Sequence, residues 1–172
     1  MMQSRRTLLS LAPLASLALL SACGFRLRGV PEFGFESLYI AAPTTSPLAR
    51  ELQRTLEGST SKLRVLRDPA TMTTAQAILD LIQEQQERVV VGLNASGQVR
   101  ELQLRLRVKF RLRTPTGVEL IPETEILQER DISYNETIAL AKEAEEALLY
   151  RTMRTDIVQQ LLRRLAVARL AP

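Results

Sequence analysis

The clearest pattern in this sequence is an unbroken alternation of apolar and polar residues from Leu102 to Arg113. Successive side chains of a β-strand point to opposite faces, so this alternation predicts a long strand with one buried face. The apolar set consists of Leu102, Leu104, Leu106, Val108, Phe110 and Leu112. The polar set, which we expect on the surface, consists of Gln103, Arg105, Arg107, Lys109, Arg111 and Arg113.

Turn signals flank this strand on both sides. Residues 114–117 (Thr-Pro-Thr-Gly) suit a three-residue hairpin loop, with proline at the second turn position and glycine at a left-handed position. The return strand is predicted at Val118–Ile132, and residues 94–97 (Asn-Ala-Ser-Gly) are a second turn candidate upstream. The sequence therefore predicts a meander of long strands.

The hairpin register decides what the cations of the polar set contact. A loop of Pro115 to Gly117 places opposite charges across the ladder in three pairs: Arg113 with Glu119, Lys109 with Glu123, and Arg107 with Glu125. In the same register Arg105 faces Leu127 and Arg111 faces Ile121, so both remain unpaired across this ladder. Opposite charges across strands stabilise a sheet and cancel its field. We interpret most of this face as salt-bridged rather than as a track for phosphates.

Two segments have helical periodicity. Ser46 suits the cap and Pro47 the first position of a short helix that Gly58 ends, with Leu48, Leu52 and Leu56 on its apolar stripe. A long C-terminal helix is predicted to begin between Ile138 and Glu143 and to run to about Leu170. Its stripe recurs every fourth residue: Leu149, Met153, Ile157, Leu161 and Leu165. We favour packing of this stripe on the apolar sheet face over binding to a membrane surface.

The remaining elements are short or ambiguous. Ser37–Ala41 and Leu63–Leu66 are predicted as short strands. Residues 74–88 combine apolar residues at helical spacing with good helix formers, and then reach the β-branched run 89–91. Local signals alone narrowly favour a helix here over a strand.

The N-terminus has the pattern of an export signal. Arg5 and Arg6 precede a short apolar run that ends in residues 20–23 (Leu-Ser-Ala-Cys). This ending resembles the lipobox of bacterial lipoproteins, in which the cysteine is lipidated and becomes the mature N-terminus. We expect residues 1–22 to be removed and acyl chains on Cys23 to anchor the protein. The alternatives are an ordinary signal peptide with a leftover thiol and a twin-arginine export signal. Gly24 is not the aspartate of inner-membrane retention, so the outer membrane is the expected destination.

Composition argues against most enzyme classes. The chain has no histidine and one cysteine, which removes His-based nucleophile pairs and metal sites. No phosphate-binding glycine motif is present, and nothing isolates two carboxylates for hydrolysis, so we expect no enzyme activity and no cofactor. Loss of residues 1–22 lowers the formal net charge from +4 to +2, so we expect no nucleic-acid partner.

Four short motifs, in this order, resemble the LptE family of lipopolysaccharide-assembly lipoproteins of Gram-negative outer membranes. They are residues 23–29 (Cys-Gly-Phe-Arg-Leu-Arg-Gly), 48–50 (Leu-Ala-Arg), Gly97-Gln98 with Glu101, and 139–142 (Ala-Leu-Ala-Lys). The resemblance covers nearly all of residues 23–172, which we expect to form a single α+β domain. It implies a four-stranded, largely antiparallel or mixed sheet with two helices packed on one face, and therefore a strand at residues 74–88.

The resemblance also implies a function. Family members plug the outer-membrane barrel LptD, help it to assemble, and assist lipopolysaccharide transport from the periplasmic side. A basic residue of the Ala-Leu-Ala-Lys segment is implicated in lipopolysaccharide contact, and here it is Lys142; Arg105 and Arg111 are weaker candidates. The family's second cation, before Gly97-Gln98, has no counterpart in this sequence. The alternative is a generic envelope lipoprotein that binds an anionic glycolipid or another outer-membrane complex.

Overall fold

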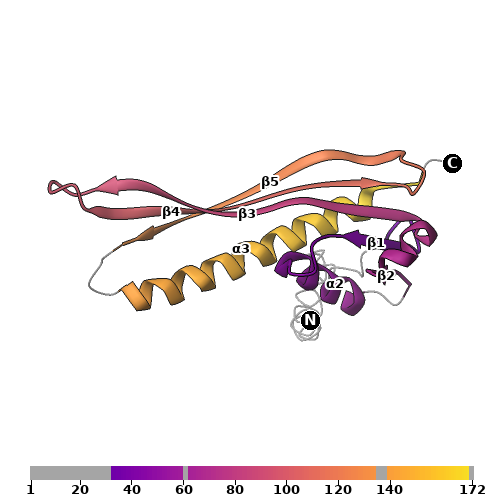
Figure 1. The fold of residues 1–172 in the computed structure, drawn as a ribbon, viewed down its shortest axis with the longest axis horizontal. Helices are drawn as coiled ribbons and strands as arrows, with labels where there is room; N and C mark the ends of the chain where they lie inside the picture. The colour runs from indigo at the N-terminus through magenta and orange to yellow at the C-terminus, as the bar shows by residue number, and fades with distance from the viewer. Residues whose placement is uncertain (1–31, 60–61, 135–138, 171–172) are drawn as a thin grey trace, which may run out of the picture. The chain divides into compact units, whose positions relative to one another are not determined.

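Five strands form one mixed sheet in the order β2-β1-β3-β4-β5 (Figure 1). The strands are β1 (Ser37–Ala41), β2 (Arg64–Leu66), β3 (Ala77–Leu93), β4 (Val99–Arg113) and β5 (Glu119–Ser133). β1 pairs in parallel with β2 and β3, and the β3-β4-β5 meander is antiparallel. The expected sheet of four strands was one strand short, because β2 pairs with β1 and becomes an edge strand.

These positions come from a computed structural model that describes residues 32–59, 62–134 and 139–170. Residues 31–172 form one compact unit. Cys23, the expected leader and the first motif of the family resemblance lie outside the described residues. Within those residues, no helix has both the length and the apolar character needed to cross a membrane.

β3 covers most of the segment whose local pattern favoured a helix, so that local expectation was wrong and the strand implied by the family resemblance is confirmed. The start of β3 is apolar on both faces. Leu79 and Leu81 face the main core, whereas Ile78 packs with Tyr39 in a second, smaller cluster on the opposite face. A short 3-10 helix, η1 (Pro69–Thr74), supplies Met72 to this cluster. Burial on both faces removes the period of two, so the apolar residues fall at helical spacing by coincidence.

The long hairpin has the predicted buried and exposed faces. All six apolar residues of the alternation from Leu102 to Leu112 are buried, and Leu106 and Phe110 have no exposed surface. Gly97 and Gly117 both have positive φ, at 79° and 94°, as their hairpin turns require. The meander and the inward face of β4 are therefore confirmed.

The register of β4 with β5 differs from the prediction along most of its length. Arg113 faces Glu119 as expected, but irregularities on either side of Leu112 then add two residues to β5. Lys109 consequently faces Glu125 rather than Glu123. Pro122 lies in the irregular stretch, and its missing N–H cannot join the ladder, which accounts for the slip.

Both helices pack on one face of the sheet (Figure 1). Helix α2 (Pro47–Ser59) begins where predicted, with Ser46 Oγ accepting a hydrogen bond of 3.0 Å from the Ala49 N–H. It continues one residue beyond Gly58, its predicted end. Helix α3 (Ala139–Val167) buries Met153, Ile157, Leu161 and Leu165 against the sheet, which confirms that its apolar stripe serves the core.

β3 changes its inward-facing set at Ile82. Before this residue Leu81 pairs with buried Phe110, and after it Glu84 pairs with buried Val108. Beyond the shift, the residues of β3 on the helix side of the sheet are Glu84, Gln86, Arg88 and Val90. The register shift therefore turns a polar row toward helix α3.

Candidate functional site

The candidate site is the surface of β4 that faces away from the helices. We call its five cations, Arg105, Arg107, Lys109, Arg111 and Arg113, the cation row. Four of them form ion pairs with acids of the neighbouring strands β3 and β5. The interpretation of this face as salt-bridged is confirmed, although several partners differ from those expected.

Asp80 of β3 holds the end of the row near the second hairpin turn. Its Oδ2 accepts hydrogen bonds of 2.8 Å from both Arg111 Nη2 and Arg113 Nε. Burial by itself would raise the pKa of Asp80, but the hydrogen bonds from Arg113 and Arg111 outweigh it and hold that pKa below its ordinary value. The same contact raises the pKa of Arg113. One carboxylate thus neutralises two guanidinium groups.

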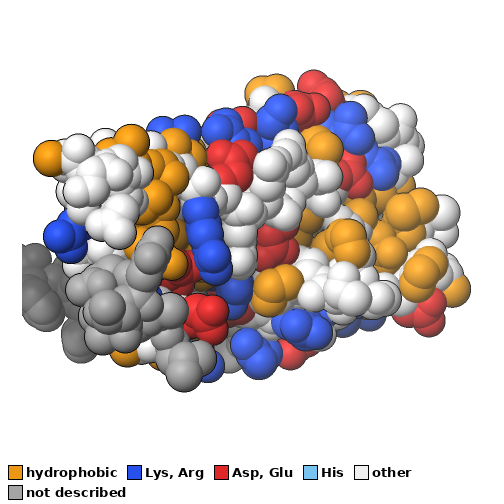
Figure 2. Space-filling model, turned by 60° about the vertical axis from the view of Figure 1, so that its left-hand side comes forward, with side chains coloured by type: hydrophobic (Ala, Val, Ile, Leu, Met, Phe, Trp, Pro, Cys, Tyr) orange, Lys and Arg blue, Asp and Glu red, His pale blue; other side chains and the backbone are white. Residues whose placement is uncertain are grey.

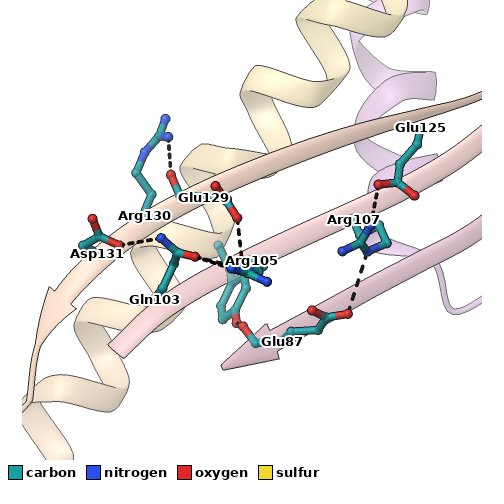
Figure 3. Close-up of polar contacts among 9 residues, drawn as sticks. Glu87, Gln103, Arg105, Arg107, Glu125, Glu129, Arg130 and Asp131 are labelled. Carbon is teal, nitrogen blue, oxygen red and sulfur yellow. Dashed lines mark hydrogen bonds and ion pairs between the residues drawn. The ribbon is translucent and has the colours of Figure 1, made fainter. Parts of the chain in front are cut away.

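Arg107 lies between acids of both neighbouring strands (Figure 3). It forms an ion pair with Glu125 of β5, and its Nε is 3.8 Å from Glu87 Oε1 of β3. In register Arg107 faces Leu127, so the contact with Glu125 is diagonal. The predicted partner is confirmed, but through a different geometry.

Arg105 was expected to be unpaired across the ladder, and that expectation was wrong. In the slipped register it faces Glu129, and its Nε is 2.9 Å from Glu129 Oε1. Gln103 Oε1 accepts two further hydrogen bonds from the same guanidinium (Figure 3). Arg111 also lacks a facing residue in β5, yet it has Asp80 on the other side. Arg105 and Arg111, the two weaker candidates for lipopolysaccharide contact, therefore both form ion pairs with acidic residues of the sheet.

Lys109 is the exception in the cation row. Within the described residues it forms neither a hydrogen bond nor an ion pair, although it faces Glu125 in register. Arg107 takes that carboxylate instead. On the face of the molecule that Figure 2 presents, Lys and Arg side chains lie next to Asp and Glu side chains, and neither charge covers a large area. Such a surface has little long-range field.

Lys142 lies in the early part of α3, on the opposite side of the sheet from the cation row. Its Nζ is 2.8 Å from Glu145 Oε2 and 3.2 Å from Ser133 Oγ, and its side chain is only 11% exposed. The structure therefore does not bring Lys142 together with Arg105 and Arg111. A lysine in this early part of a helix gains nothing from the helix dipole, so its pair with Glu145 is its visible stabilisation.

Sequence reasoning missed three ion pairs that hold α3 to the sheet. Arg88 Nε is 2.8 Å from Glu146 Oε2, Arg130 Nη2 is 2.9 Å from Asp156 Oδ2, and Arg154 Nε is 3.9 Å from Glu84 Oε1. Arg88 and Glu84 belong to the row that the register shift at Ile82 turns inward. No local signal marks that shift, so the pairs of Arg88 and Glu84 could not be read from the sequence.

Tyr150 completes the contact between α3 and β3. Its hydroxyl donates a 2.7 Å hydrogen bond to the backbone carbonyl of Glu87. Burial, reinforced by the negative charge of Glu146, raises the pKa of Tyr150. The phenol therefore stays protonated and remains a donor at neutral pH.

The site's chemistry is that of paired charges. The described residues contain no group of three or more acids, histidines or cysteines placed to hold a metal ion. The site thus defines a class: an α+β domain with two helices on one face of a mixed sheet and ion pairs across the other. Comparison with known proteins places this domain. The chain belongs to the LptE family, described as lipopolysaccharide-assembly, whose model matches residues 35–165.

Individual relatives agree with this assignment. The chain is 32% identical to an LPS-assembly lipoprotein LptE of Yersinia enterocolitica, over 96% of this chain and 78% of that protein. The solution structure of an uncharacterized lipoprotein B from Nitrosomonas europaea superposes with a TM-score of 0.68 at 35% identity, covering 81% of this chain and 88% of that one. The crystal structure of the rare lipoprotein B from Shewanella oneidensis shares the fold, with a TM-score of 0.63 at 24% identity over 76% and 93% of the two chains.

Proposed function

We propose that this protein is a non-enzymatic lipoprotein of the outer membrane that assists lipopolysaccharide assembly. The observation that carries the proposal is the LptE family match across residues 35–165, which includes the sheet, all of α2 and nearly all of α3. The relative from Yersinia enterocolitica is named for the same role.

The proposed anchor is Cys23. Removal of residues 1–22 leaves this cysteine at the mature N-terminus, where acyl chains would hold the protein on the periplasmic face of the outer membrane. One acyl chain binds a membrane only marginally, whereas two or more hold it firmly. The remaining residues, 23–172, would form the single LptE-like domain.

The proposed protein partner is an LptD-like barrel, which the domain would plug and help to assemble. The ion-paired sheet surface supports this role, because side chains already neutralised by their neighbours lose less on transfer into a confined interior than unpaired charges do.

The proposed ligand is lipopolysaccharide, with Lys142 as the first candidate contact and Arg105 and Arg111 as weaker ones. Each of the three is already paired, with Glu145, Glu129 and Asp80 respectively. A lipid phosphate would therefore have to replace a carboxylate, which favours Lys142, a point charge with one acidic partner, over Arg111, whose partner also binds Arg113.

Co-purification tests the proposal. The full chain with a C-terminal affinity tag is extracted from outer membranes in mild detergent, and bound protein and lipid are identified by mass spectrometry. A barrel protein retained in near-equal amount supports the plug. Lipid retained without a barrel contradicts the plug and supports a generic glycolipid-binding module.

A further inference from the structure

Helix α3 is held to the sheet in two different ways, and the change falls at Met153. From Met153 to its end, the buried side chains of the helix are all apolar: Met153, Ile157, Val158, Leu161, Leu162 and Leu165. In the first half, residues 141–152, only Glu146 and Tyr150 are buried. Leu149, which belongs to the predicted apolar stripe, is half-buried, and Leu148 is exposed. The first half therefore contributes little apolar surface to the core.

Three polar contacts fasten the first half to the neighbouring strands: Lys142 with Ser133, Glu146 with Arg88, and Tyr150 with the backbone carbonyl of Glu87. The carboxylate of Glu146 is buried, yet its Oε2 accepts no hydrogen bond from the described residues and relies on the charge of Arg88. Detachment would return this carboxylate to water, which offsets part of the loss of the ion pair. Detaching the second half would instead expose its buried apolar side chains to water.

The first half covers an apolar pair at the end of the sheet near the β3-β4 turn, where Figure 1 shows the start of α3. Leu102 of β4 faces Ile132 of β5, and both are buried. Along the strands, the contact through Arg88 lies on one side of this pair and the contact through Ser133 lies on the other. The helical segment between the two contacts therefore passes over the pair. Val90, which faces Leu102 from β3, is already 51% exposed.

We propose that the first half of α3 is a lid that leaves the sheet as one unit while the second half stays packed. The second half stays in place through its apolar side chains and through Thr155, whose hydroxyl donates a hydrogen bond of 2.6 Å to Glu51 of α2. A detached helix of about twelve residues is marginal in water, so the lid unwinds when it opens. Opening adds Leu102 and Ile132 to the exposed Val90, and so enlarges the apolar surface at this end of the domain.

Native-state hydrogen exchange tests the lid, with the detergent-solubilised full chain at urea concentrations below the unfolding transition. The amides of residues 145–152 should be protected at least about tenfold less than those of residues 157–165. Their exchange should depend only weakly on urea, because opening exposes little surface, whereas exchange at 157–165 should follow the slope of global unfolding. Equal protection and equal urea slopes in the two halves would overturn the proposal.

A first variant separates lid opening from global unfolding. Leu112→Ala removes a fully buried side chain at the far end of β4 from the lid. It should speed exchange at 157–165 by at least about tenfold and leave exchange at 145–152 within about twofold of wild type. Equal acceleration of both segments would mean that α3 opens only with the whole domain, which also overturns the lid.

A second variant acts on one of the fasteners. Tyr150→Phe keeps the ring and removes the hydrogen bond to Glu87, so exchange at 145–152 should become about fivefold faster. Tyr39→Phe, the same change on the other face of the sheet, is the control and should leave exchange at 145–152 unchanged. An unchanged rate in Tyr150→Phe would contradict the role given to this contact. Neither lipopolysaccharide nor a barrel enters these measurements, so they are independent of the proposed function.

Discussion

Arg88 on β3 forms an ion pair with Glu146 on α3 in which one partner is open to solvent and the other is not. The Arg88 side chain is 62% exposed, whereas that of Glu146 is 5% exposed. The charge of Glu146 has been taken out of water, and the cation that balances it reaches in from the surface. Removing Arg88, which leaves a buried charge without a partner, should therefore destabilise the fold more than neutralising Glu146.

Arg88→Ala should destabilise the fold by about 1–3 kcal/mol, because it leaves the carboxylate of Glu146 buried without a cation. The double variant Arg88→Ala/Glu146→Gln should recover part of the loss. Urea unfolding followed by circular dichroism measures both. A double variant no more stable than Arg88→Ala would show that the charge of Glu146 is not what makes the single change costly.

Leu106→Ala should cost about 2–5 kcal/mol, since Leu106 is fully buried at the centre of β4. Its neighbour Arg107 points to the other face, and Arg107→Ala should cost about 1 kcal/mol or less despite two acidic partners. Thermal unfolding of the two variants compares the faces of one strand directly. A smaller loss for Leu106→Ala than for Arg107→Ala contradicts the assignment of the core.

Asp80→Asn should destabilise the protein at neutral pH by about 1–3 kcal/mol, because two arginines lose their shared carboxylate. The pKa of Asp80 is lowered in the folded state, so the unfolded chain binds its proton first. The stability that this carboxylate contributes is complete above its ordinary pKa of 3.8 and is lost as the pH falls further.

The difference between wild type and Asp80→Asn should therefore shrink below about pH 4 in unfolding curves recorded across the acid range. Glu119→Gln is the control, since it removes an acid whose nearest cation, Arg111, is 4.0 Å away, and it should change stability less. A gap between wild type and Asp80→Asn that stays constant through this range would contradict the assigned role.

Lys142→Glu should weaken lipopolysaccharide retention at low ionic strength while leaving the fold and barrel association intact. Glu145→Gln is the matched control, because it removes the partner of Lys142 and keeps the lysine. If Lys142 contacts lipid phosphate, the control should retain at least as much lipopolysaccharide as wild type. Unchanged retention by a folded Lys142→Glu protein would reduce Lys142 to a surface ion pair.

Cys23→Ser should release the protein from the outer-membrane fraction unless a barrel partner retains it. The physical reason is the loss of acyl chains, each buried methylene of which contributes about 0.8 kcal/mol to membrane binding. Intact mass spectrometry of the membrane-extracted wild type supplies the check on the premise. An unmodified Cys23 there would refute lipidation at this residue.

The elements with a single buried face were predictable from sequence. The alternation of β4 and the apolar stripe of α3, which recurs every fourth residue, both identified side chains that pack in the core, and Ser46 identified the start of α2. In each case one face meets the core and the other meets water, so the period survives in the sequence.

The parts that could not be predicted depend on neighbours distant in sequence. η1 buries Ile78 on the second face of β3 and so disguises a strand as a helix. The irregular stretch at Pro122 shifts the register of β5 by two residues, so Arg105 faces Glu129 instead of Leu127. The shift at Ile82 turns Glu84 and Arg88 toward α3. Lys142 was singled out by resemblance, and the structure pairs it with Glu145.

The two ends of the described domain meet: Gly34 bridges in parallel to Arg169, and a Cβ on Gly34 would lie 2.7 Å from the carbonyl oxygen of Ala168. The leucines of the sheet are covered by α3, which follows all five strands in sequence. The core of this domain therefore cannot be completed until α3 is available. Until then the sheet exposes an apolar surface and open strand edges, which makes the incomplete chain prone to aggregation. A chaperone that shields the exported chain until α3 arrives would meet the need that this topology creates.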